Sequence, residues 1–207
     1  QIAVSMLPAF YLIFSGRTEI SFMNFSIDLG WFYPLFAVFM IVGSSNALNL
    51  TDGLDGLAAG CSVFAFGACA ILCKLNGYTD LAIISAATCA ACLGFLYFNK
   101  NPAKIFMGDT GSLALGGLLA TIAIMGKFEL WLIPIGILFI CETLSVMIQV
   151  ASFRLTGKRV FKMSPIHHHF ELCGWGEKKI VFVFSSVSAL GGIAAIAGFY
   201  IQKMFGN

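Results

Sequence analysis

The chain has 207 residues, of which 59% are hydrophobic and only 11% are charged, and its net charge is +2. A soluble domain of this length has about a quarter of its residues charged, so this composition excludes a soluble protein. The small net charge gives no reason to expect a nucleic-acid partner. The class that remains is an all-α polytopic membrane protein, because the period-two alternation of a membrane barrel is absent.

Seven apolar segments follow one another along the chain, and each is read as a transmembrane helix. They cover residues 1–14, 31–50, 57–74, 81–98, 112–126, 130–153 and 180–202. The chain begins inside the first segment without an initiator Met, so we expect it to be the later part of a longer protein. Because no internal repeat is visible, we expect residues 1–207 to form a single transmembrane domain.

The connections between these segments alternate between the two sides of the membrane. One side holds residues 51–56, 99–111 and 154–179. It carries eight of the twelve basic residues: Lys100, Lys104, Arg154, Lys158, Arg159, Lys162, Lys178 and Lys179. Cytoplasmic loops are rich in Lys and Arg, so we expect this side to face the cytoplasm. On the other side, the alternation in residues 15–30 predicts a small outer hairpin.

The first polar motif, NALNLTDGLDGLAAG, covers residues 46–60. Asn46, Asn49, Asp52 and Asp55 recur every third residue, which keeps them near one face of a helix. Carboxylates at the edge of a membrane span are costly unless they face water, a metal or a substrate. The alternative is a polar helix end with two exposed aspartates.

The second motif, FMGDTGSLALGG at residues 106–117, places Asp109 where a span begins. A helix start suits phosphate, but an aspartate repels phosphate unless a cation lies between them. The pattern therefore predicts Mg²⁺ bridging Asp109 to a diphosphate, against the alternative that Asp109 only caps the helix. Phe106 is placed to stack on a base or to anchor the chain at the membrane interface.

The third motif, SPIHHHFELCGWGE at residues 164–177, contains the only three histidines of the chain. Successive residues diverge on a helix or a strand, so the three rings cannot converge on one ion. We expect one or two of them to contact a substrate phosphate or to carry protons, while another holds the loop by a hydrogen bond. The alternative is a solvated basic loop.

The segment 130–153 carries a polar stripe formed by Glu142, Ser145, Gln149 and Ser152. Such a stripe faces a cavity or another helix. It leads into the histidine segment, so we expect it to line the same cleft, unless Glu142 and Ser145 serve only in contacts between helices.

Together the three motifs resemble the bacterial phospho-MurNAc-pentapeptide transferases, a branch of the polyprenyl-phosphate N-acetylhexosamine-1-phosphate transferase superfamily. The first two motifs are shared across that superfamily, and PIHHHFE with the following GW is more specific to this branch. The resemblance covers essentially the whole chain. It implies a ten-helix bundle, of which this chain holds the last seven helices, in a homodimer of the bacterial plasma membrane.

The resemblance also implies the reaction. Members transfer phospho-MurNAc-pentapeptide from UDP-MurNAc-pentapeptide to undecaprenyl phosphate, a membrane lipid, and release lipid I and UMP. They are Mg²⁺-dependent enzymes of peptidoglycan synthesis with a cytoplasmic active site. An aspartate either deprotonates the acceptor phosphate or forms a covalent intermediate, and the sequence leaves both mechanisms open.

Matched to the family's motifs, this sequence supplies three catalytic residues and seven substrate-binding residues. Asp109 corresponds to the Mg²⁺ ligand, and Asp52 and His168 are the other two catalytic residues. The substrate-binding residues implied are Asn49, Asp55, Asn99, Phe106, Gln149, His167 and His169.

One departure from the family concerns an Asp-Asp pair in an earlier cytoplasmic loop. No adjacent aspartates occur in this chain. We therefore expect the spans that carry the pair to lie outside it, and the chain alone to be inactive.

Three other functions are weighed against the pattern. A sister transferase that uses UDP-GlcNAc differs only in its sugar pocket, and the histidine segment argues against it. A transporter would place its aspartates in broken helices at mid-membrane. A scaffold without catalysis has no need of three polar motifs on one side. Binding of uridine compounds distinguishes the transferases from the rest.

Overall fold

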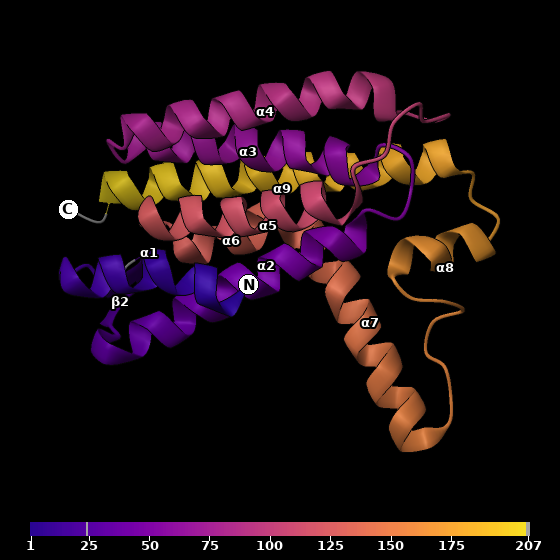
Figure 1. The fold of residues 1–207 in the computed structure, drawn as a ribbon, viewed down its shortest axis with the longest axis horizontal. Helices are drawn as coiled ribbons and strands as arrows, with labels where there is room; N and C mark the ends of the chain where they lie inside the picture. The colour runs from indigo at the N-terminus through magenta and orange to yellow at the C-terminus, as the bar shows by residue number, and fades with distance from the viewer. Residues whose placement is uncertain (24, 206–207) are drawn as a thin grey trace.

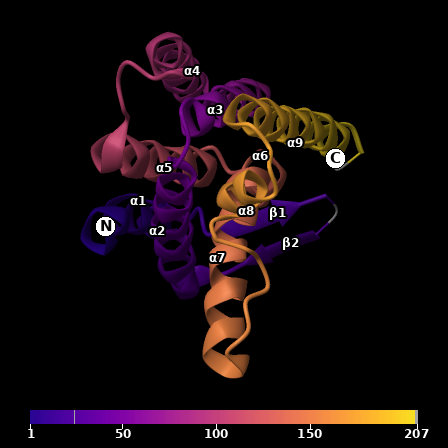
Figure 2. The same ribbon diagram turned by 90° about the vertical axis from the view of Figure 1, so that its right-hand side faces the viewer.

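The computed structural model describes residues 1–23 and 25–205. Four long helices lie side by side along its longest axis, as Figure 1 shows: α3 (Leu57–Leu75), α4 (Thr79–Asn99), α5 (Gly108–Met125) and α9 (Glu177–Phe205). α1 (Ile2–Phe14) and α2 (Tyr33–Thr51) pack beside α5. α7 (Ile137–Thr156) leaves this bundle and projects away from it, which is clearest in Figure 2.

Within the described residues, six helices are long and apolar enough to cross a membrane, and α1 is a shorter apolar helix of 13 residues. These seven helices coincide with the seven predicted spans to within a few residues, except in the sixth. The class predicted from composition, an all-α polytopic membrane protein, is confirmed. The larger ten-helix bundle stays a prediction.

The hairpin predicted for residues 15–30 is confirmed. Strands β1 (Glu19–Phe22) and β2 (Phe25–Asp28) pair antiparallel, with Glu19 opposite Asp28 and Phe22 opposite Phe25. A one-turn 3₁₀ helix, η1 (Gly30–Phe32), leads from this hairpin into α2.

The sixth predicted span, 130–153, is wrong as a single helix. The chain forms a 3₁₀ turn, η2 (Glu129–Trp131), then the short helix α6 (Leu132–Ile135), and restarts as α7 beyond Gly136. Pro134 and Gly136 explain the break, because proline removes a backbone donor and glycine weakens a helix. The break also meets α9, since a Cβ on Gly191 would lie 2.1 Å from the Pro134 carbonyl oxygen.

A buried polar cluster ties the hairpin end of the bundle together. Glu129 is 1% exposed, and its Oε1 accepts hydrogen bonds from Tyr33 Oη and Lys127 Nζ, both at 2.6 Å. Arg17 donates to the Tyr78 hydroxyl at 2.7 Å. A buried carboxylate is tolerated only when it is paired in this way.

At the other end of the bundle, α2 ends and α5 begins, and we call this end the site end. The two helices approach closely because Gly116 of α5 has no side chain: a Cβ there would lie 2.3 Å from the Ser44 carbonyl oxygen of α2. One residue along, Ser45 Oγ donates to the Leu113 carbonyl at 2.8 Å. Small residues at a helix crossing let backbones meet, as is common in membrane bundles.

Gly116→Ala is therefore expected to destabilise the protein, because the new methyl group meets rigid backbone. Overpacking of this kind costs about 1–3 kcal/mol, so we expect a melting temperature in detergent lower by about 5 °C. Gly117→Ala is the matched control, since the nearest atom to a Cβ there is a side-chain carbon of Ile41 at 3.9 Å. Equal melting temperatures for the two variants would contradict the close approach.

Candidate active site

The close packing of α2 and α5 brings Asn49 and Asp109 together at the site end. Asn49 Nδ2 donates to Asp109 Oδ1 and to Ser112 Oγ, each at 2.9 Å. Ser112 is buried, and its hydroxyl donates a hydrogen bond to the Gly108 carbonyl at 3.0 Å. One carboxylate oxygen of Asp109 is thus fixed by an amide, and the side chain as a whole remains exposed to solvent.

Asp52 follows the last residue of α2 and is half-buried beside the start of α5. Burial raises the pKa of Asp52 above its ordinary value, the backbone N–H of Gly108 opposes this shift, and the charge of Asp109 adds to it. Two carboxylates therefore stand close enough to repel one another, at a helix start whose free N–H groups favour anions.

A second group of polar contacts fixes the turn after Asp52. Asp55 Oδ2 accepts a hydrogen bond from the Ala103 backbone N–H at 2.9 Å, which ties the turn to the segment between α4 and α5. Glu177, in the first turn of α9, accepts from the Asp55 backbone N–H at 2.8 Å and from Asn101 Nδ2 at 2.5 Å. One carboxylate thus links α9 to two separate loops.

Asn99 and Phe106 flank the same segment, with opposite exposures. Asn99 is 4% exposed, and its amide accepts from the Gly56 backbone N–H at 3.1 Å and donates to the Ile105 carbonyl at 2.9 Å. Phe106 is 78% exposed. Both polar ends of the Asn99 side chain are used in holding backbone, whereas the ring of Phe106 is free to stack on a planar ligand.

The histidine segment forms a short helix, α8 (Ile166–Leu172), where the sequence predicted a loop. Its three rings have different surroundings, as the divergence of successive residues predicted. His169 Nδ1 accepts from the Lys162 backbone N–H at 3.1 Å, so it holds the preceding segment. His168 is half-buried and pairs with Glu171 at 2.5 Å. His167 is buried and faces Glu142 of α7.

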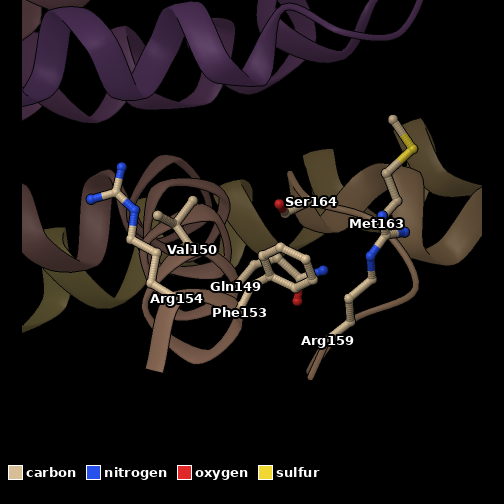
Figure 3. A pocket seen from close by; sticks show the side chains of 7 residues that line it. All are labelled: Gln149, Val150, Phe153, Arg154, Arg159, Met163 and Ser164. Carbon is tan, nitrogen blue, oxygen red and sulfur yellow. The ribbon is translucent and has the colours of Figure 1, made fainter. Parts of the chain in front are cut away.

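Gln149 of α7 holds the segment that returns from α7 toward α8. Its Oε1 accepts from the backbone N–H groups of Val160 and Phe161 at 3.0 and 2.9 Å, and its Nε2 donates to the Phe161 carbonyl at 2.9 Å. A pocket of about 400 Å³, open to solvent, lies beside this arrangement, and Figure 3 shows the side chains that line it. The pocket is lined by Gln149, Val150, Phe153, Arg154, Arg159, Met163 and Ser164.

The structure therefore gathers the predicted residues into neighbouring groups. Asn49, Asp52 and Asp109 form one, and Asp55 and Asn99 form the next. α8 lies next to the first group, because the ring of His167 packs against Gly53. Gln149 and His169 hold the segment between α7 and α8 by hydrogen bonds to its backbone. The catalytic and binding roles of all these residues stay predictions.

Sequence reasoning missed Glu177, which supports the site through Asp55 and Asn101. An acidic residue in the first turn of a helix is ordinary, because it complements the helix dipole, so nothing in the sequence marks Glu177 as special. A metal cluster built from three or more His, Cys, Asp or Glu side chains is absent from residues 1–23 and 25–205.

Comparison with known proteins assigns this architecture to a family. Residues 1–127 match the model of glycosyl transferase family 4, which is more than half of the chain, so the chain belongs to this family.

Its relatives carry a more particular name, phospho-N-acetylmuramoyl-pentapeptide-transferase. The relative from Geobacillus thermodenitrificans is 56% identical over 189 residues, which are 91% of this chain and 57% of the relative. The Shouchella clausii protein is 60% identical over 86% of this chain and 54% of its own length. The Bacillus subtilis protein is 54% identical over 93% of this chain and 58% of its own length. The chain thus spans little more than half the length of these relatives.

Asp55→Ala is expected to loosen the segment between α4 and α5. The backbone N–H of Ala103 loses its acceptor, and a lost hydrogen bond of this kind costs about 1–2 kcal/mol. Amide hydrogen exchange at Ala103 and at its neighbours Asn101 and Lys104 should therefore become faster by about tenfold or more. Asp80→Ala, an exposed aspartate at the start of α4, is the control and should leave this exchange unchanged. Unchanged exchange in Asp55→Ala would show that the carboxylate does not anchor the segment.

Asp52→Asn is expected to raise thermal stability in metal-free buffer at pH 7. The folded protein raises the pKa of Asp52, so this group disfavours folding once the pH exceeds the carboxyl's ordinary pKa of 3.8. The variant should melt about 2 °C higher at pH 7, and its advantage should shrink as the pH falls toward 4. Melting curves across this range test the sign, and a variant that is less stable than the wild type at pH 7 would refute it.

Proposed function

We propose that the protein containing this chain transfers phospho-MurNAc-pentapeptide from UDP-MurNAc-pentapeptide to undecaprenyl phosphate, releasing UMP and forming lipid I in peptidoglycan synthesis. The observation that carries the proposal is the 54–60% identity to relatives named phospho-N-acetylmuramoyl-pentapeptide-transferase. The polar groups at the site end support it, because they offer carboxylates, an exposed ring and histidines on one side of a membrane bundle. Since the chain spans little more than half of these relatives, the activity is proposed for the whole protein.

The carboxylate of Asp109, with Asp52 close beside it, fits a Mg²⁺ ion. Mg²⁺ is usually held by one or two carboxylates together with substrate phosphates and water, so a larger cluster is not required. Asp109 is exposed, and Asn49 leaves its second oxygen free of that amide. The repulsion between the two aspartates is what a cation would relieve. When bound, the ion would neutralise the diphosphate and stabilise the UMP leaving group.

Around the substrate, the chain's own residues divide the remaining tasks. Phe106 stacks on the uracil, and His168, kept in orientation by Glu171, contacts the sugar diphosphate. Asp52 has a raised pKa, so it is suited to accept a proton from the acceptor phosphate. Asn49 and Asn99 hold the two loops that carry these groups.

We also propose an orientation in the membrane and an oligomeric state. The site end carries most of the basic residues, so we place it in the cytoplasm and the protein in the inner membrane. The resemblance to the transferase branch further implies a homodimer. Light scattering of the detergent-solubilised protein should therefore give the mass of two protomers.

Asp109→Asn is expected to abolish turnover in the protein produced from its complete reading frame. UMP release from UDP-MurNAc-pentapeptide should require undecaprenyl phosphate and Mg²⁺, and the variant should lose at least about 100-fold in kcat because a metal carboxylate is removed. Gly117→Ala serves as the control that alters the same helix without touching the site.

Comparing the two nucleotide-sugar donors in this assay separates the competing functions. Release of UMP from UDP-GlcNAc but not from UDP-MurNAc-pentapeptide would move the protein to the sister transferases. Silence with both donors, together with no binding of uridine nucleotides, would refute the transferase proposal altogether.

A further inference from the structure

Glu142 and His167 form a pair of titratable groups buried between α7 and α8. Their side chains are 0% and 1% exposed, and Glu142 Oε2 lies 3.1 Å from His167 Nδ1. Since both groups are already covered by the described residues, any further part of the protein can only bury them more deeply. The contact between them is an ion-pair approach, and none of the four side-chain nitrogen and oxygen atoms makes a hydrogen bond with a described residue.

The opposite edge of the His167 ring touches the turn that carries Asp52. A Cβ on Gly53 would lie 2.3 Å from His167 Nε2 and 2.8 Å from Cε1. The ring therefore occupies the space that any other residue at position 53 would fill. Glu142, the imidazole and the Asp52–Gly53 turn form one contiguous stack from α7 to the site.

A carboxylate on an apolar helix is costly unless a cation or a donor lies beside it. Within the part of the chain that the structure describes, His167 is the only ion-pair partner of Glu142. A carboxylate at this position favours a proton on Nδ1, whether the ring is neutral or charged. Nε2 is then directed at the turn in a defined state: an acceptor in the neutral ring and a donor in the imidazolium.

We propose that Glu142 is a positioning residue of the active site. It keeps the proton of His167 on Nδ1 and so fixes the ring that supports the turn bearing Asp52. The proposal rests on the proposed function wherever activity is measured. The position of the ring proton is independent of that function and can be measured without any substrate.

The test uses the protein from its complete reading frame, labelled with ¹⁵N-histidine and placed in phospholipid bilayers. Nitrogen shifts distinguish a protonated from an unprotonated ring nitrogen, and His167→Asn assigns the signal. We expect Nδ1 of His167 to be protonated in the wild type. We expect Glu142→Gln, which keeps the shape and removes the charge, to change this signal.

The kinetic arm compares Glu142→Gln with Glu129→Gln, a second buried and ion-paired carboxylate that lies at the hairpin end. Loss of a group that orients a site residue typically costs about 10–100-fold, and we expect this loss in kcat with KM changed by less than about threefold. Glu129→Gln should lower the melting temperature, but leave both kcat and the His167 signal unchanged.

The two arms fail in different ways. An unprotonated Nδ1 in the wild type would overturn the inference even if no variant folds. So would a Glu142→Gln variant with wild-type kcat and an unchanged signal, or a Glu129→Gln variant with the same kinetic loss. A wild type without transferase activity but with the expected Nδ1 proton and its loss in Glu142→Gln would refute the proposed function alone.

Discussion

The candidate site depends on how closely α2 and α5 approach one another. Gly116 allows the two backbones to meet, and the hydrogen bond from Ser45 to the Leu113 carbonyl fixes the contact. Because these helices run in opposite directions, the end of one is held against the start of the other. Asn49 therefore reaches Asp109, and the charge of Asp109 acts on Asp52. A side chain at position 116 would push α2 and α5 apart, and so would separate Asn49 from Asp109 without contacting either residue.

Around this crossing, buried and half-buried carboxylates connect segments that are far apart in the chain. Glu177 joins α9 to two loops, Glu142 faces α8, and Glu129 ties the hairpin end together. A buried carboxylate without a partner is strongly destabilising, so the contacts of Glu142 and Glu129 favour one arrangement of their neighbours. Apolar packing alone favours one arrangement of the helices much less strongly, because the surrounding lipid is as apolar as the helix surfaces.

Much of the fold could be predicted because its signals are local. Apolar length located the spans, alternation located the hairpin, and the spacing of Asn49, Asp52 and Asp55 marked the first polar turn. What could not be predicted depends on contacts between distant segments. Glu177 meets Asp55 across 122 residues, and the burial of His167 requires α7, α8 and Gly53 together. The break at Gly136 was missed because the apolar pattern continues through it.

The position of Glu177 has a consequence for the order of synthesis. The turn containing Asp55 leaves the ribosome before α9, although the carboxylate that accepts its backbone N–H lies 122 residues later, in the first turn of that helix. His167, which lies against Gly53, is also made late. Asn99 and Ala103 can hold the turn once α4 and the segment after it have been made, but the contacts from His167 and Glu177 form only after α8 and the start of α9 have been translated. A nascent chain stalled before α8 would contain Asp52 and Asp55 and still lack the two contacts that His167 and Glu177 make with their turn.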